Sequence, residues 1–276
     1  MSESAILRKL RPSDVPAALQ LSTEAGWNQT ADDWRMLIDL APDGCLGIDV
    51  DGELASTATL LCYGRRLAWI GMVLTRIAFR GHGYARRLLT ETLTLADQMR
   101  IESVKLDATD QGQPLYEKLG FRPEQPVERW ARTEPSSPSS ADPKSANEAT
   151  PESWHAADPA AFGLDRTPLL ENLALRHRPL TSGRSYLLTR PGRLTNYLGP
   201  SVADSPAIAQ ALLSRALQIP NQAGFSWDIL LENTAAVRLA RDFEFTPKRH
   251  LLRMVRGKDL RGQEQSIFAI AGFELG

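Results

Sequence analysis

The stretch from Ala68 to Arg100 constrains the fold of this chain more than any other part of the sequence. Its beginning, residues 68–74, is apolar and long enough for a buried strand. From Gly83 onward apolar residues recur at helical spacing and form one stripe. The stripe consists of Ala85, Leu88, Leu89, Thr92, Leu93 and Ala96. The stretch therefore predicts a strand, a short connector and a helix that packs one face against a core.

Basic residues and glycines gather where this helix begins. The basic residues are Arg80, His82, Arg86 and Arg87. No carboxylate precedes Glu91, although acidic residues are the usual choice beside the positive end of a helix. Gly81 and Gly83 let an outside group approach the backbone, so the connector suits a bound anion such as a pyrophosphate. A solvated basic face and a tight turn explain the same residues, and the motif alone does not choose between these interpretations.

Composition narrows the class of protein. A formal net charge of −1 over 276 residues gives no reason to expect a nucleic-acid or membrane partner. Cys45 and Cys62 have no metal-ligand or redox spacing, so we expect a reducing compartment and no metal site. The sequence has no apolar run of signal-peptide or membrane-spanning length, which predicts a cytoplasmic location.

The order of predicted elements indicates two related halves. Residues 134–152 are rich in proline, serine, alanine and charge, which predicts a flexible linker between domains at 1–133 and 153–276. In the first domain we expect helices at 15–25, 34–40, 83–100 and 114–119, and strands at 5–10, 45–50, 54–63, 68–74, 103–108 and 121–130. In the second we expect helices at 169–175, 207–217 and 234–242, and strands at 185–189, 195–198, 227–231 and 250–255.

Two motifs in the first domain resemble a known enzyme family. The run Arg80-Gly81-His82-Gly83-Tyr84-Ala85 resembles the (Gln/Arg)-x-x-Gly-x-(Gly/Ala) signature of the GCN5-related N-acetyltransferases, and residues 115–121, LYEKLGF, look like their second signature. One helix and one strand separate the two motifs, as in that family. The details WIGMV, LDAT and GWNQT, and LLRMVRG in the second half, resemble bacterial tandem acetyltransferases of the YitH-like type.

The resemblance implies an α/β fold in which each domain has a mixed, twisted central sheet flanked by helices. In the first domain the sheet would splay after its fourth strand, and acetyl-CoA would lie in the gap. The pyrophosphate would bind the backbone of Arg80, Gly81, His82, Gly83, Tyr84 and Ala85. Arg86 or Arg87 would reach the 3′-phosphate, while Met72, Val73 and Thr75 would hold the pantetheine arm and the thioester.

The resemblance also suggests the residues that carry the chemistry. Tyr116 occupies the position of the family's general acid, which protonates the departing thiolate, although a packing aromatic is the alternative. Proton removal from the attacking amine would fall to Asp107, Glu53 or a chain of waters, and Asp107 also fits a structural role. Trp27 and Asn28 would border the acceptor, although Trp27 equally fits a half-buried anchor.

The second domain departs from both signatures. The segment 199–206, GPSVADSP, has neither paired glycines nor basic residues, and Asp204 looks like an ordinary acidic helix cap. Ala240 stands at the tyrosine position, and Glu244 stands where the motif has glycine. We therefore expect a degenerate copy that binds no cofactor and walls off the acceptor pocket of the first domain.

Together these features predict an acetyl-CoA-dependent N-acetyltransferase that acts on a primary amine of a small molecule or peptide, as a monomer or homodimer. A non-catalytic acyl-CoA sensor or assembly module is the main alternative. A dinucleotide-binding oxidoreductase fits less well, because Arg86 stands where that fingerprint needs a small residue and residues 76–80 separate the strand from the glycines.

Overall fold

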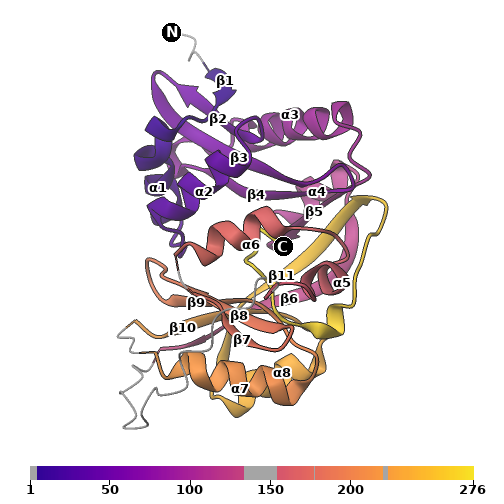
Figure 1. The fold of residues 1–276 in the computed structure, drawn as a ribbon. Coiled ribbons are helices and arrows are strands. Elements are labelled where there is room, and N and C mark those ends of the chain that lie inside the picture. Colours follow the sequence, from indigo (N-terminus) through magenta and orange to yellow (C-terminus); the bar gives the residue numbers. More distant parts are fainter. Residues whose placement is uncertain (1–4, 134–153, 177, 220–222) are drawn as a thin grey trace. The chain divides into compact units, whose positions relative to one another are not determined.

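The computed structural model describes residues 5–133, 154–176, 178–219 and 223–276 (Figure 1). Unit 1 comprises Met1–Glu124, Leu252–Leu260 and Phe273–Gly276, and unit 2 comprises Gln125–Leu251 and Arg261–Gly272. The expected division at 133 and 153 differs from these units, because two late segments cluster with unit 1 and most of the strand after 121 clusters with unit 2. The expected linker, 134–152, lies outside the described residues.

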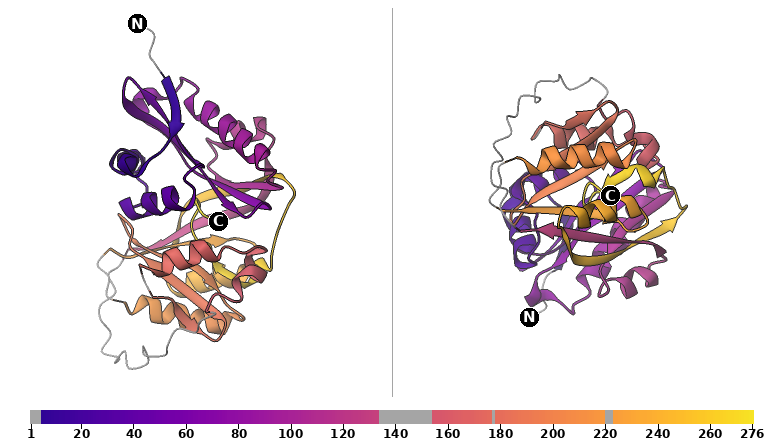
Figure 2. Two further views of the ribbon diagram at one scale, coloured as in Figure 1. Left: turned by 45° about the horizontal axis from the view of Figure 1, so that its top comes forward. Right: turned by 90° about the horizontal axis from the view of Figure 1, so that it is seen from below.

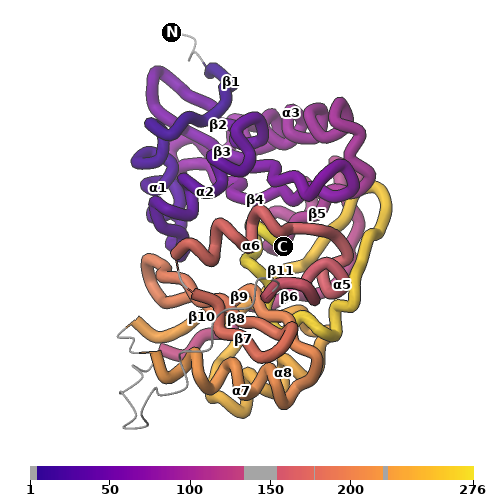
Figure 3. The backbone as a smooth tube through the Cα atoms, in the orientation of Figure 1, coloured from indigo at the N-terminus to yellow at the C-terminus, as the bar shows by residue number. Residues whose placement is uncertain are grey.

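Unit 1 follows the expected order of elements closely. Its strands are β1 (Ala5–Lys9), β2 (Cys45–Val50), β3 (Glu53–Tyr63), β4 (Leu67–Thr75) and β5 (Ser103–Ala108). Its helices are α1 (Val15–Glu24), α2 (Ala31–Leu40), α3 (Tyr84–Gln98) and α4 (Gln113–Lys118), with short 3-10 turns at Pro12–Asp14 and Ile77–Phe79. Figure 3 traces the path from β4 through α3 and β5 to α4.

Local sequence signals account for several of these boundaries. Thr30 caps α2 by accepting a hydrogen bond from the Asp33 amide, while the Asp33 side chain accepts one from the Thr30 amide. Asp51 and Gly52 both have positive φ angles, as a tight turn between β2 and β3 requires. The helix before Gly26 ends as expected, with that glycine in the left-handed region.

The sheet of unit 1 has the strand order β1-β2-β3-β4-β5-β11, in which β11 (Thr246–Gly257) contributes its second half, Leu252–Gly257. Neighbouring strands are antiparallel except for β4 and β5, which are parallel. Helices α3 and α4 cover one face of this sheet, while α1 and α2 lie on the other side (Figure 2, left). The mixed sheet flanked by helices confirms the predicted fold class.

Unit 2 repeats the strand–helix order. Its helices are α5 (Asp158–Phe162), α6 (Thr167–Ala174), α7 (Pro206–Leu217) and α8 (Thr234–Asp242). Its strands are β6 (Arg122–Arg132, from Gln125 onward), β7 (Leu180–Ser182), β8 (Ser185–Arg190), β9 (Asn196–Val202), β10 (Phe225–Leu230), the first half of β11, and β12 (Ile267–Ala269). They lie in the order β11-β6-β10-β9-β8-β7, and β12 pairs with β9.

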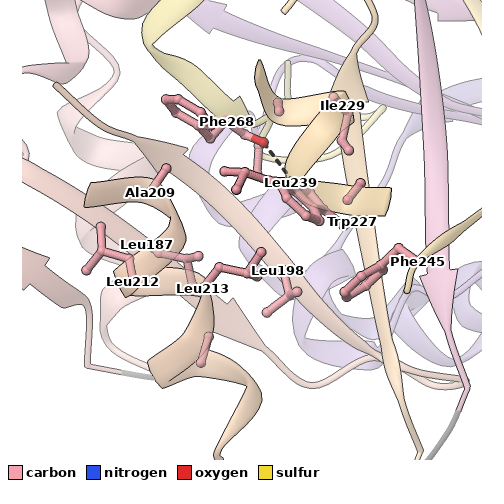
Figure 4. Close-up of a cluster of buried hydrophobic side chains, with 14 of the residues drawn as sticks. Leu187, Leu198, Ala209, Leu212, Leu213, Trp227, Ile229, Leu239, Phe245 and Phe268 are labelled. Carbon is pink, nitrogen blue, oxygen red and sulfur yellow. Dashed lines mark hydrogen bonds between the residues drawn. The ribbon is translucent and has the colours of Figure 1, made fainter. Parts of the chain in front are cut away.

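The core of unit 2 lies between its sheet and helices α7 and α8. Figure 4 shows its aromatic centre, where the Trp227 indole N–H donates to the carbonyl oxygen of Phe268 at 2.7 Å. Asn233 caps α8 by accepting from the Ala236 amide. The expected cap at Asp204 is wrong: Ser205 caps α7, because its hydroxyl lies one residue closer to the first turn and accepts from the Ile208 amide.

Candidate active site

Strands β4 and β5 separate from each other within the sheet of unit 1. They pair in parallel only from Leu67 to Trp69, opposite Ser103 to Lys105. Beyond Trp69, β4 continues along β3, whereas β5 continues along the second half of β11. Within the described part of the chain, no strand pairs with the β5-side edge of residues 70–75. This splay after the fourth strand agrees with the sequence-based expectation.

A bulge in β4 lies just beyond the point of parting. The pairing with β3 shifts register between Thr57 and Thr59, so Met72 and Val73 together face a single residue of β3. Met72 has a φ angle of 49°, a left-handed conformation that is uncommon for a side chain of this size. The Thr57 hydroxyl donates to the Met72 carbonyl oxygen at 2.8 Å and holds this peptide. Met72 and Val73 are both predicted to contact the thioester. The bulge takes their backbone out of the regular hydrogen-bonding pattern between β3 and β4.

Helix α3 begins without a capping side chain. Its N-cap residue, Gly83, is in the left-handed region, and the first turn contains no acidic residue. Gly81 is left-handed as well, and a Cβ atom added at either glycine would have no neighbour within 4 Å. The first turn of α3 thus carries neither a capping side chain nor a carboxylate, and the two glycines leave room beside the backbone, which is compatible with a phosphate group at this helix start.

The basic side chains at this helix start have different roles. Arg80 Nε donates to the Thr75 carbonyl oxygen at 3.2 Å, and Arg87 donates to the Ala5 carbonyl oxygen at 3.0 Å. His82 turns back to the Arg80 carbonyl oxygen and stacks on the ring of Tyr84, which is itself buried. The exposed Arg86 makes no hydrogen bond or ion pair among the described residues, which leaves its guanidinium available to an anion.

Tyr116 projects from α4 into the core beside the parted strands. It shares one apolar cluster with Ile70 of β4, Leu106 of β5 and Phe121, whose ring it meets edge to face at 6.0 Å. Burial raises the pKa of the Tyr116 phenol to about 12. The phenol therefore keeps its proton at neutral pH, as a general acid must.

Asp107 lies in β5 and is paired with an arginine from β11. Arg253 donates from Nε and Nη2 to the two carboxylate oxygens at 2.9 and 3.1 Å, and both side chains are almost fully buried. The Arg253 guanidinium also stacks over the Trp69 ring at 4.5 Å. The guanidinium therefore occupies both oxygens of this carboxylate. The geometry favours the structural interpretation of Asp107, and its role as base stays a prediction.

The remaining candidates lie toward the ends of β3 and α1. Trp27 and Asn28 are half-buried in the loop between α1 and α2, where the Trp27 amide donates to the Ser22 carbonyl oxygen. Glu53 forms an ion pair with Arg76, directly after β4. Contact of Trp27 and Asn28 with an acceptor stays a prediction.

Two contributors to this region were not anticipated. Arg253 was assigned to a separate domain, and only its pairing partner in β5 reveals its place in unit 1. The segment Phe273–Gly276 also packs on β4: the Trp69 indole donates to the Phe273 carbonyl oxygen at 2.9 Å. Gly71 permits this approach, since a Cβ there would lie 2.8 Å from Glu274 backbone atoms. The glycine of the WIGMV motif was the available sequence signal.

The described residues contain no group of three or more histidine, cysteine or acidic side chains suited to a metal ion. Among the same residues, no helix is both long and apolar enough to cross a bilayer.

Both halves of the chain match models of known protein families. Residues 14–121 match the model described as "Acetyltransferase (GNAT) family", and residues 155–269 match a second one described as "Acetyltransferase (GNAT) domain". The chain belongs to the GNAT family. It is a tandem GNAT protein and an acyltransferase enzyme, which confirms the sequence-based resemblance.

Several proteins are similar to this GNAT chain over most of its length. The uncharacterized N-acetyltransferase YitH of Bacillus subtilis (strain 168) is 29% identical over 244 residues, which is 83% of each chain. The holothin acyltransferase of a Pseudoalteromonas species (strain SANK 73390) is 24% identical over 261 residues, 91% of this chain and 87% of that one. A candidate acetyltransferase from Pyrococcus horikoshii has the same fold, with a TM-score of 0.83 and 23% identity over 99% of this chain and 96% of its own.

Proposed function

We propose that unit 1 is an acetyl-CoA-dependent N-acetyltransferase that moves an acetyl group to a primary amine by direct attack. The observation that carries this proposal is the parting of β4 and β5 between an uncapped helix start and the buried phenol of Tyr116. A thioester with a pyrophosphate needs both a strand edge and an anion site, and this region offers the two on consecutive elements.

The residues present suit acyl-CoA as a substrate. The pyrophosphate would accept hydrogen bonds from the backbone amides at Gly81, Gly83 and the first turn of α3, which has no capping side chain. Arg86 would meet the 3′-phosphate, because Arg87 is already engaged with Ala5. The unpaired edge of residues 70–75 would bind the amides of the pantetheine arm, as another strand would.

Each proposed chemical role falls to a group of this chain. A backbone amide at the bulge of Met72 and Val73 would stabilise negative charge on the carbonyl oxygen under attack. Tyr116 would deliver its proton to the departing sulfur. The proton that the attacking amine loses would pass to Glu53 or to a chain of waters. In this scheme Asp107 is a positioning residue, because its carboxylate is paired with Arg253.

The acceptor is proposed to be a small molecule or peptide amine, held in part by Trp27 and Asn28. One similar protein of nearly the same length is named for acyl transfer to holothin, which supports a small-molecule acceptor without identifying it. The competing sensor function predicts tight acyl-CoA binding without turnover. The oxidoreductase alternative is wrong, since the fold and the family are those of an acyltransferase.

Free-thiol release from acetyl-CoA over a panel of amines tests this function, with wild type compared with Tyr116→Phe. We expect release with at least one amine and a loss of about 100-fold or more in kcat for the variant. Acetyl-CoA binding without release for any amine would favour the sensor. Faster release with a longer acyl-CoA would correct the acyl group.

A matched pair of glycine variants tests where the cofactor binds. Gly83 and Gly52 have φ angles of 79° and 85°, and neither would bring an added Cβ within 4 Å of a neighbour. Gly83→Ala and Gly52→Ala should therefore carry a similar backbone penalty of about 1–2 kcal/mol. Only Gly83→Ala should weaken CoA binding, by about tenfold or more, in calorimetric titration. Equal affinity for CoA in the two variants would refute the proposed site.

A further inference from the structure

The strand parting of unit 1 recurs in unit 2. Strands β9 and β10 pair in parallel only from Asn196 to Leu198, opposite Phe225 to Trp227. This is the same short parallel overlap that β4 and β5 form before they separate. The pairing of β9 with β8 also shifts register directly after Leu198, as that of β4 with β3 does at its bulge. Unit 2 therefore retains the strand geometry in which unit 1 is proposed to hold acyl-CoA.

In unit 2, however, the edge of β9 beyond the parting is taken by β12. Ile267 pairs with Val202 and Ala269 pairs with Ser201, in antiparallel orientation. The next amide along the chain, that of Ile270, donates to the Asp228 carbonyl oxygen of β10 at 3.1 Å. Residues 267–270 thus satisfy backbone groups on both strands at the place where these strands separate.

Side chains hold β12 there from the direction of the core. The Trp227 indole donates to the Phe268 carbonyl oxygen, as Figure 4 shows. Asn233, which caps α8, also donates to the Ile267 carbonyl oxygen at 2.8 Å. All side chains from Ile267 to Ile270 are buried. Exchange of this segment for a ligand would therefore expose apolar surface and break the hydrogen bonds from Trp227 and Asn233.

The other cofactor features of unit 1 are missing beside this strand. The start of α7 is closed by the Ser205 cap and Pro206, in contrast to the open glycines before α3. Ala240 stands where unit 1 has Tyr116, and its methyl group is buried in the core. A peptide strand and a pantetheine arm both present amide groups to a strand edge, so one can replace the other.

We infer that β12 is a built-in occupant of the second unit's counterpart of the acyl-CoA site. It takes the strand edge that pantetheine is proposed to take in unit 1, so the chain binds one acyl-CoA and not two. The inference rests on the proposed function for the location of the site in unit 1. It adds that unit 2 is closed by a segment of its own chain, in addition to having lost its binding motif.

Calorimetry and hydrogen–deuterium exchange of the full chain with coenzyme A test the inference. We expect one CoA per chain, new protection at residues 70–75 and 80–86, and slow exchange at 267–270 that is the same with and without CoA. Two CoA per chain, or faster exchange at 267–270 upon saturation, would overturn the inference while leaving the proposed function intact. A lack of CoA binding would overturn both, and CoA protection confined to unit 2 would reverse the assignment.

A pair of tryptophan variants supplies the control. Trp227→Phe removes the indole N–H that bonds to Phe268. Trp130→Phe makes the same change in the same cluster, at an indole N–H that has no hydrogen-bond partner among the residues that the structure describes. We expect exchange at 267–270 to become about fivefold faster in Trp227→Phe than in Trp130→Phe, with CoA protection of residues 70–75 unchanged in both. Equal exchange in the two variants would contradict the proposed anchoring of β12.

Discussion

Replacement of Arg253 by methionine should destabilise unit 1 strongly, because it leaves a buried carboxylate without its partner. The Arg253 side chain is 4% exposed and that of Asp107 is 0% exposed. Two charge-assisted hydrogen bonds, at 2.9 and 3.1 Å, would be lost together with the stacking on Trp69. Removal of one partner of a buried ion pair costs about 3–5 kcal/mol, so we expect a loss of this size in the free energy of unfolding.

The double variant Asp107→Leu/Arg253→Met separates the pair from its surroundings. Apolar residues of similar volume often replace a buried ion pair at little net cost, so the double variant should unfold within about 2 kcal/mol of wild type. Asp107→Leu alone should lose about as much as Arg253→Met, because it leaves the guanidinium buried. The two single changes should therefore be strongly non-additive, with a coupling energy of about 4 kcal/mol or more.

Urea denaturation followed by circular dichroism measures these free energies, and exchange at the β5 amides assigns them to unit 1. Additive losses in the double variant would refute the energetic coupling of Asp107 and Arg253. Thiol release by the double variant separates the two roles of Asp107. If Asp107 only positions β5, a folded double variant should keep kcat within about tenfold of wild type. A loss of 100-fold or more, the scale of general base catalysis, would restore Asp107 as the base.

Three further outcomes follow from the site. Since burial raises the pKa of Tyr116 to about 12, the phenol stays protonated as the pH rises from 7 to 10, and a pH profile of kcat should show no loss from its ionisation there. Arg86→Gln should raise the Kd for CoA about fivefold or more but leave that for dephospho-CoA unchanged, whereas Arg87→Gln should affect both little; equal effects on the two ligands would exclude a 3′-phosphate contact. Burial also raises the pKa of the Cys45 thiol to about 12, so Cys45 should resist Ellman's reagent at pH 8 unless the chain is unfolded, and rapid labelling of the native protein would contradict this burial.

Elements with a local signal were predictable from the sequence. The apolar stripe and the missing acidic first turn defined α3, and the spacing from Gly83 to Tyr116 identified the family. Strand β5 was predicted to the residue, and the caps at Thr30 and Asn233 follow from side chains that reach the first-turn amides. These features depend on contacts between residues close in sequence, which a single sequence contains.

Features that depend on distant partners were not predictable in the same way. Strand β12 has three residues, too few to show an alternating apolar pattern in the sequence. It is defined by its pairing with β9. The left-handed backbone conformation of Met72 depends on a register shift between β4 and β3, and no local sequence pattern predicts that shift. The partner of Asp107 lies 146 residues away along the chain. Whether Trp27 and Asn28 meet an acceptor depends on a ligand, and that expectation stays a prediction, as does a walling role for the second domain.

Unit 1 includes Leu252–Leu260 and Phe273–Gly276, so its folding during synthesis is complete only after these segments have been made. The edge of β5 is completed by Leu252–Gly257, and Phe273–Gly276 covers Trp69 on β4. At a synthesis rate of about 5–20 residues per second, roughly 7–30 s pass between the synthesis of Asp107 and that of Arg253. During that time the β5 edge and the Asp107 carboxylate lack the partners that β11 supplies. Nascent unit 1 therefore has to be kept from aggregation until the second half of the protein has been made, and a gene fragment that ends near residue 133 encodes an incomplete sheet.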